Sequence, residues 1–185
     1  MSILADIAHR AAQGNLPFIL IGGNAVVAHG YPRQTQDFDF MVREIDRRGW
    51  NALMVSLRYR AHHVSRAFHM YAPPAAPLPP VDFMLVDTAT FDRLQAGAEK
   101  VEMDSIEVSI PSLPHLIALK LHAVRQGGDD RRPVDLADVA ELVRLNHVDL
   151  AIAPYPEILE RYGTADIRRK LSILLEGGGP EPADS

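Results

Sequence analysis

Residues 22–40 read GGNAVVAHGYPRQTQDFDF and connect two segments that are typical of β-strands. Gly22 and Gly23 end the first segment, and Asp37 and Asp39 lie in the second. Glycine weakens regular elements and aspartate is disfavoured inside strands, so both choices have a local cost. These four residues are therefore the first candidates for a functional site.

Asp37 and Asp39 share one face of their strand because side chains alternate along it, with Phe38 and Phe40 on the other face. The two carboxylates would lie about 7 Å apart along the strand and repel each other unless a cation lay between them. One interpretation is a solvated strand face above an aromatic core, which is the commoner outcome for an isolated D-x-D. The other is a Mg²⁺ site, since Mg²⁺ binds one or two carboxylates together with substrate phosphates.

The glycines fit the second interpretation. A strand that ends at Gly22 and Gly23 and runs into a short helix over 24–30 leaves free backbone N–H groups, with no Cβ to obstruct an anion. Asn24 could cap this helix or donate to a phosphate oxygen. The alternative is a tight strand-to-helix turn with an asparagine cap.

A third carboxylate, Asp82, lies early in the apolar segment 81–87. A charged side chain in such a strand needs a partner. If this strand neighbours the one with Asp37, three carboxylates converge on one sheet face, which is typical of two-metal phosphoryl and nucleotidyl transfer. Asp87, at the end of the segment, is expected to be a turn residue or a helix cap.

The remaining patterns predict an α/β (α+β) fold with a small mixed sheet and a helical C-terminal part. The predicted core covers residues 1–110, the helical part packed on it covers 111–176, and 177–185 form a disordered tail. The helix over 44–57 would place Ile45, Trp50, Leu53 and Leu57 near one face. Proline excludes the loop 72–80 from any sheet interior. The other predicted elements are helices over 1–15, 112–126, 133–146, 156–163 and 165–177, and strands over 16–23, 37–42, 58–64, 67–72 and 81–87.

Composition excludes several classes of protein. Nineteen basic and twenty-four acidic side chains give a net charge of −5, which argues against a surface that covers nucleic acid broadly, although a local basic cleft remains possible. The chain has no cysteine, so disulfides and thiolate metal sites are excluded. No signal peptide or segment of transmembrane length is present, and we expect a cytoplasmic protein.

The segment 21–40 resembles the signature of the DNA polymerase beta-like nucleotidyltransferase superfamily, and is most similar to its small bacterial AbiEii group. The resemblance includes Arg33, Thr35 and the strand with Asp82, and continues through LIALKLHAVRQ (116–126) and DRRPVDLADVAEL (130–142). It implies that Gly22 and Gly23 hold the triphosphate of an NTP.

The same resemblance implies that Asp37 and Asp39 bind Mg²⁺ or Mn²⁺, and that Asp82 completes the metal site and helps to activate the acceptor hydroxyl. The chain departs from the group at two positions. Asn24 stands where many members have serine, and Val134 stands where a lysine often precedes the aspartate. The implied nucleotide-binding residues are Gly22, Gly23, Asn24, Arg33, Lys120, Arg132 and Asp135.

Lys120 falls in phase with an apolar helical stripe. It must snorkel, pair with an acid, or reach into a cleft, where it would compensate charge beside a triphosphate. Arg132 and Asp135 lie at the start of the next predicted helix, and Asp138 is a further candidate three residues on. Asp135 also suits the helix N-terminus without any further function.

Three histidines, His62, His63 and His69, suggest a zinc site at first sight. Their spacing matches no standard set of zinc ligands, and we expect exposed histidines on a pair of strands.

The expected function is metal-dependent transfer of a nucleoside monophosphate from an NTP to an acceptor, with release of pyrophosphate. The acceptor is open and includes tRNA, a protein hydroxyl and a small molecule. The first alternative is a non-catalytic nucleotide-binding or toxin-antitoxin-type regulatory protein on the same fold, and a phosphohydrolase is the second. A partner protein or a homodimer is compatible with either.

Overall fold

The computed structural model describes residues 2–126 and 132–177. It divides into two compact units. The first unit consists of Met1–Ala28 and Pro32–Ser112, and the second of His29–Tyr31 and Leu113–Ser185.

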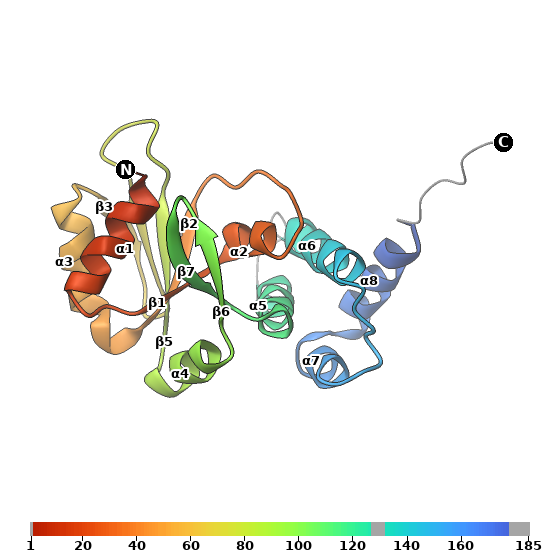
Figure 1. The fold of residues 1–185 in the computed structure, drawn as a ribbon. Helices are drawn as coiled ribbons and strands as arrows, with labels where there is room; N and C mark the ends of the chain where they lie inside the picture. Colours follow the sequence, from red (N-terminus) through yellow and green to blue (C-terminus); the bar gives the residue numbers. More distant parts are fainter. Residues whose placement is uncertain (1, 127–131, 178–185) are drawn as a thin grey trace. The chain divides into compact units, whose positions relative to one another are not determined.

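A five-stranded mixed sheet organises the first unit (Figure 1). Its strand order is β1-β2-β5-β4-β3, in which β2 and β5 are parallel and the other neighbours antiparallel. A separate hairpin of β6 and β7 completes the strands described. The predicted mixed α/β class is confirmed. The strands are β1 (Phe18–Ile21), β2 (Phe38–Arg43), β3 (Arg60–Val64), β4 (Phe68–Ala72), β5 (Val81–Val86), β6 (Glu99–Met103) and β7 (Ile106–Ile110).

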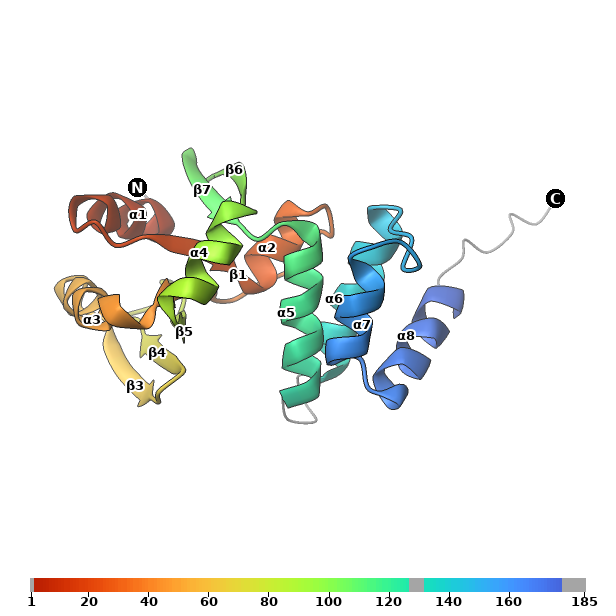
Figure 2. The same ribbon diagram turned by 90° about the horizontal axis from the view of Figure 1, so that it is seen from below.

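Helices cover both faces of this sheet. In Figures 1 and 2, α1 and α3 lie along one face, and α2, α4 and the β6–β7 hairpin lie on the other. Asp87 is the N-cap of α4, where its side chain accepts a hydrogen bond from the Thr90 N–H, so the expectation of a cap is confirmed. The helices of this unit are α1 (Ile3–Gln13), α2 (Gly22–Ala28), the 3-10 helix η1 (Glu44–Asp46), α3 (Arg47–Ser56) and α4 (Thr88–Ala96).

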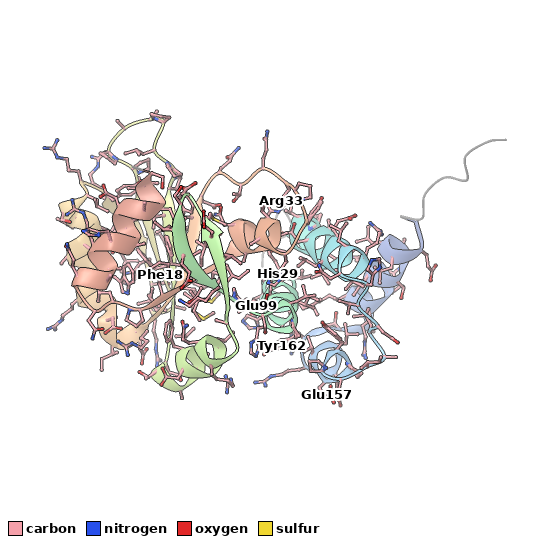
Figure 3. The ribbon with its side chains drawn as sticks, in the orientation of Figure 1. Phe18, His29, Arg33, Glu99, Glu157 and Tyr162 are labelled. Carbon is pink, nitrogen blue, oxygen red and sulfur yellow. The ribbon has the colours of Figure 1, made fainter. Side chains whose placement is uncertain are left out.

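The face under α1 and α3 is packed with aromatic rings. Phe40 stacks on Phe83 at 5.6 Å between ring centroids, and Trp50 of α3 lies 5.0 Å from Phe83. Phe18, at the start of β1 (Figure 3), makes edge contacts with Phe40 and Trp50. Aromatic pairs of this kind stabilise a fold by more than the apolar area that they bury. This face of the sheet is therefore occupied by core packing. We call this side of the sheet the aromatic face. The opposite side is the acid face, because Asp39 and Asp82 lie there.

Several features differ from the sequence prediction. Gly22 and Gly23, which were expected to end the first strand, are the first two residues of α2, and β1 ends at Ile21.

Of the four residues predicted for one face of the helix over 44–57, Trp50 and Leu53 are buried in α3, together with Met54. Ile45 is 75% exposed because η1 holds residues 44–46 and α3 begins only at Arg47, and Leu57 follows the end of α3 and is half-buried. The sequence also gave no expectation for 88–110, where the structure has α4 and the β6–β7 hairpin.

The second unit is helical, as predicted. The apolar stripe of α5, with Leu116, Ile117 and Leu121, is buried where α5 packs on α6 and α7, and α8 packs on α6. From residue 178 onward, the predicted tail lies outside the described residues. Among the described helices, none combines the length and the hydropathy that crossing a bilayer requires. The helices are α5 (Leu113–Gln126), α6 (Arg132–Leu145), α7 (Tyr155–Tyr162) and α8 (Ala165–Gly177).

Candidate active site

Three carboxylates meet at the start of β2 and β5. Asp39 is directly opposite Asp82 in the parallel pairing of these strands, and Asp37 comes immediately before β2. One oxygen from each of the three carboxylates lies within 4.8 Å of the other two. The structure therefore brings together the three aspartates that the sequence singled out, on one face of the sheet. We call them the carboxylate cluster.

Electrostatics make this cluster costly without a counter-charge. Two full negative charges about 5 Å apart repel by roughly 3 kcal/mol in the effective dielectric of a protein surface. Carboxylate oxygens are the hard ligands that Mg²⁺ and Mn²⁺ prefer, and a group of three such oxygens at this separation fits a divalent ion. The cluster is thus compatible with a divalent metal, and its chemistry alone does not choose between the two ions.

Gly22 makes the approach of Asp39 possible. Its φ of +65° lies in the left-handed region, and a Cβ at this position would overlap the Oδ2 atom of Asp39. Any side chain at residue 22 would therefore strain the backbone and push this carboxylate away. Gly22 is therefore needed for the packing of Asp39, in addition to the tight turn or phosphate contact that the sequence suggested.

Gly23 has an equally close neighbourhood. A Cβ here would lie 2.5 Å from the Thr35 hydroxyl and 3.0 Å from Nη2 of Arg33. Figure 3 shows Arg33 in the loop between α2 and β2, where its Nη1 also donates to the Gln34 carbonyl at 3.0 Å. The second glycine thus lets this loop fold closely over the start of α2.

Asn24 and Thr35 hold the main chain of Asp37. The buried side chain of Asn24 donates to the Asp37 carbonyl at 2.9 Å. The Thr35 hydroxyl lies 3.3 Å from Oδ1 of Asp37 and 3.4 Å from its carbonyl oxygen. Asn24 therefore positions an acid of the cluster, whereas the sequence suggested a cap or a phosphate ligand. Thr35 was not selected as a site residue, although its spacing of two from Asp37 and four from Asp39 is a usable signal.

Lys120 is buried in the second unit between two acids. Its Nζ lies 2.8 Å from Oδ1 of Asp135 and 2.7 Å from Oδ2 of Asp138. The Lys120 side chain is 9% exposed and that of Asp138 is 1% exposed. Of the three outcomes foreseen for Lys120, pairing with an acid is therefore the one observed in this unit.

These contacts lie wholly within the second unit, and a role of Lys120 or Asp135 in binding nucleotide stays a prediction. Arg132 begins α6, but its side chain lies outside the described residues. Asp135 is in the first turn of this helix, where a carboxylate also stabilises the N-terminal dipole.

The three histidines do not form a common site. His62 and His63 are exposed on β3, as expected, but His69 is only 7% exposed, so that expectation was wrong for it. His69 and Tyr71 alternate on β4 and point to the aromatic face, where their rings lie 6.5 Å apart. Burial and the positive charge of Arg47 lower the pKa of His69, against a smaller opposing effect of the Ser65 backbone. Among the described residues, the one group of three possible metal ligands is the carboxylate cluster.

A mixed sheet with three carboxylates gathered on one face is an arrangement suited to metal-dependent phosphoryl or nucleotidyl transfer, and comparison with protein families gives the particular group. The family model "Nucleotidyl transferase AbiEii toxin, Type IV TA system" matches residues 3–182. The chain therefore belongs to this family of nucleotidyltransferases, and the resemblance found in the sequence is confirmed. No curated protein matches the sequence significantly.

Solved structures support the same fold. The antibiotic-resistance factor ANT(2'')-Ia is similar with a TM-score of 0.58 and 17% identity over 94% of this chain and 88% of that one. The lincosamide antibiotic adenylyltransferase LnuA, bound to lincomycin, is similar with a TM-score of 0.56 and 13% identity over 75% and 93%. An antigenic nucleotidyltransferase-like protein from Paracoccidioides brasiliensis has a TM-score of 0.52 and 16% identity over 95% and 94%. At these identities, the likeness extends to the fold alone.

Proposed function

We propose that the protein transfers a nucleoside monophosphate from an NTP to an acceptor hydroxyl, with Mg²⁺ or Mn²⁺ held by Asp37, Asp39 and Asp82. The observation that carries this proposal is the carboxylate cluster, whose oxygens lie within 4.8 Å of one another in a chain of the nucleotidyltransferase family. A divalent cation bound between these acids would offset their mutual repulsion.

Each aspartate has a separate part in the proposal. Asp37 and Asp39 would hold the metal ion that accompanies the triphosphate. When bound, this ion would polarise the phosphate oxygens and withdraw charge from the acceptor hydroxyl. Asp82 accepts the proton of that hydroxyl as its oxygen bonds to the α-phosphorus. The bond from the α-phosphorus to the oxygen bridging to the β-phosphorus then breaks, and pyrophosphate leaves.

The triphosphate is proposed to lie against Gly22, Gly23 and Arg33. In support, the guanidinium of Arg33 lies next to Gly23, so a positive charge and backbone N–H groups are at the same place. Asn24 contributes indirectly, through the Asp37 carbonyl. The further residues proposed to bind nucleotide are Lys120, Arg132 and Asp135.

The division into a catalytic core over 1–110 and a helical part over 111–176 is part of the same proposal. The family description names a toxin of a type IV TA system, which supports an antitoxin as the partner of this protein. We further propose a cytoplasmic location, and tRNA, a protein or a small molecule as the acceptor.

Labelled nucleotides test the proposal. The full-length chain is incubated with cell extract, Mg²⁺ and each of the four NTPs, labelled at the α-phosphate. Transfer gives pyrophosphate and a labelled acceptor, hydrolysis gives free labelled nucleotide, and a non-catalytic binder gives neither. We expect transfer by the wild type and none by Asp39→Asn. Hydrolysis without labelled acceptor, or equal activity of the variant, would refute the proposal.

A further inference from the structure

A cavity of about 570 Å³ lies within the second unit, between the end of α5, the start of α6 and α8, which are labelled in Figure 2. All its lining residues belong to this unit, whereas the carboxylate cluster belongs to the first. Its volume is typical of cavities that bind small molecules, about 300–1,000 Å³. Ten described residues line it. A stable protein–protein interface uses about 20–30 residues on each side, so the size favours a small ligand.

Most of the wall of this cavity is apolar. Val124 of α5, Leu136 of α6 and Ile167 of α8 form its buried part. Ile173 and Leu174 of α8 also line it and are 56% and 38% exposed. Large apolar side chains that are open to water favour a ligand that covers them. The cavity therefore suits a ligand with an apolar body.

The same cavity has an excess of positive charge. Arg125 and Lys170 line it and are exposed, and Asp166 is the one acid among the described lining residues. Asp166 pairs with Lys170 at 2.8 Å and with Arg169 at 2.9 Å. Arg169 therefore still compensates this acid when Lys170 contacts another anion. The apolar wall is thus accompanied by two cations that can bind an anionic group.

A contact within the unit holds Arg125 in place. Its Nη1 donates to the Arg161 carbonyl at 2.8 Å, shortly before α8 begins at Ala165. A guanidinium has five N–H donors, so Arg125 keeps others for a ligand. The planar guanidinium loses little conformational entropy for each hydrogen bond that it forms. Arg125 is therefore well prepared to bind a carboxylate.

Polar and apolar lining residues are separated along α8. Thr164 and Asp166 line the cavity at the start of this helix, and Ile173 and Leu174 line it near the end. At 1.5 Å per residue, Asp166 and Leu174 are about 12 Å apart along the helix axis. A ligand with a charged group at one end and an apolar chain at the other matches this separation.

We propose that this cavity binds a fatty acid of medium chain length. The carboxylate contacts Arg125 and Lys170, and the alkyl chain covers Ile173 and Leu174. The inference assigns a second binding site to this chain and does not depend on the proposed function.

Isothermal titration calorimetry of the full-length chain with sodium decanoate, below the concentration at which decanoate forms micelles, tests the proposal. We expect saturable binding of one decanoate per chain. Octanoate should bind about fifteenfold more weakly, since each buried methylene raises the affinity about fourfold. The uncharged 1-decanol should bind about tenfold more weakly than decanoate, because it lacks charge-assisted hydrogen bonds.

Two double variants test the two parts of the site. Arg125→Gln/Lys170→Gln should bind decanoate about tenfold more weakly and 1-decanol as the wild type does, because only the carboxylate loses its partners. Ile173→Gln/Leu174→Gln should bind both ligands about fivefold more weakly or worse, because less apolar surface is covered.

Matched controls change residues of the same kinds that do not line the cavity. Arg93→Gln/Arg168→Gln removes the same charge from two exposed positions. Leu145→Gln/Ile152→Gln replaces apolar side chains of the second unit that are 45% and 62% exposed. Both controls should bind decanoate like the wild type, and thermal unfolding checks that all four variants are folded.

Three results with decanoate would overturn the proposal. They are the lack of saturable binding, equal affinities for decanoate and 1-decanol, and equal losses in the variants and their controls. Binding to anionic phospholipid vesicles but not to monomeric decanoate would also overturn it, in favour of a membrane surface. Self-association in sedimentation that Ile173→Gln/Leu174→Gln abolishes, without decanoate binding, would instead assign the cavity to a second copy of the chain.

Discussion

At the scale of single residues, the site is costly to the fold. Like charges directly opposite each other destabilise a pair of strands, yet Asp39 and Asp82 are Cα partners in the parallel ladder. Asp37 adds a third negative charge, and its carbonyl and carboxylate are held by Asn24 and Thr35. Local destabilisation at a functional site is expected where other parts of the fold maintain the geometry.

The substitution Asp82→Asn separates binding from chemistry. It keeps the shape of the side chain and removes one charge of the cluster, so the ligand-free protein should be at least as stable as the wild type. Binding of Mg²⁺ with NTP should stay within several-fold, because Asp37 and Asp39 suffice for one ion. Pyrophosphate release should fall about a hundredfold or more, the usual effect of losing a positioned proton acceptor. Unchanged turnover in this variant would exclude Asp82 from the mechanism.

His69 is a second residue in a costly environment. It is buried, and within the described residues its Nε2 has no hydrogen-bond partner. Its pKa is lowered below the ordinary 6.5 by burial and by Arg47. Below about pH 6.5, the unfolded chain therefore takes up a proton that the folded protein resists, and the free energy of unfolding falls as the pH falls.

We expect His69→Phe to remove this part of the pH dependence. A phenyl ring keeps most of the volume and leaves no buried nitrogen unsatisfied, so the variant should match or exceed wild-type stability at pH 7.5. Urea denaturation at pH 7.5 and 5.5 measures the difference. The same substitution at exposed His62 is the control and should keep the wild-type loss between these pH values. A variant at His69 that loses as much stability as the wild type would contradict the assignment.

At the scale of elements, the junction of β1, α2 and β2 builds the site. Backbone φ of +65° at Gly22 turns the chain from β1 into α2 while Asp39 of β2 lies against it. Gly23 lets Thr35 and Arg33 approach the start of α2. The two glycines are therefore part of the same geometry as the aspartates.

The substitution Gly22→Ala tests this junction against Gly30→Ala. Both glycines have positive φ, of +65° and +98°, but a Cβ at Gly30 meets nothing within 4 Å. Gly30→Ala should therefore show the cost of backbone strain alone, about 1–3 kcal/mol. Gly22→Ala should cost more in urea denaturation, since the Cβ also displaces Asp39, and it should abolish the stabilisation by Mg²⁺ with NTP. Equal costs and intact stabilisation in both variants would show that Asp39 tolerates the Cβ.

At the scale of the whole molecule, the two units are stabilised differently. The first has an aromatic face that includes Phe40, Trp50 and Phe83. The second unit buries the apolar stripe of α5. Lys120 lies in this stripe, as a buried cation between Asp135 and Asp138. Removing one partner of a buried ion pair costs far more than removing one at the surface.

Lys120→Met should accordingly destabilise the protein by about 3–5 kcal/mol at neutral pH, because two acids, of which Asp138 is buried, lose their cation. Thermal and urea unfolding of the full chain measure this cost. Lys100→Met is the control, since Lys100 and Glu107 form an exposed pair at 3.3 Å, and it should cost less than about 1 kcal/mol. Similar costs for the two variants would mean that Lys120 is not needed to compensate these acids.

Local patterns in the sequence determined the sites of most elements. Strict alternation fixed β2 with its aspartates on one face and Phe40 on the other, and apolar phase predicted α5 with Lys120 in its stripe. Turns are predicted from the types of residue they contain, and a turn made of less usual residues is not recognised in this way. The turn between β6 and β7 has positive φ at Asp104 and Ser105, where the common signal is a glycine, so the hairpin was missed.

Only the tertiary structure decided which distant residues meet. The apolar run 81–87 predicted a strand with Asp82 near its start, but the parallel pairing of β2 and β5 put Asp82 opposite Asp39. The sequence could not show that His69 is covered, because burial depends on α3 packing over that face. Alternation and helical phase are set by neighbours along the chain, whereas strand order and close approach are set by packing between segments far apart in it.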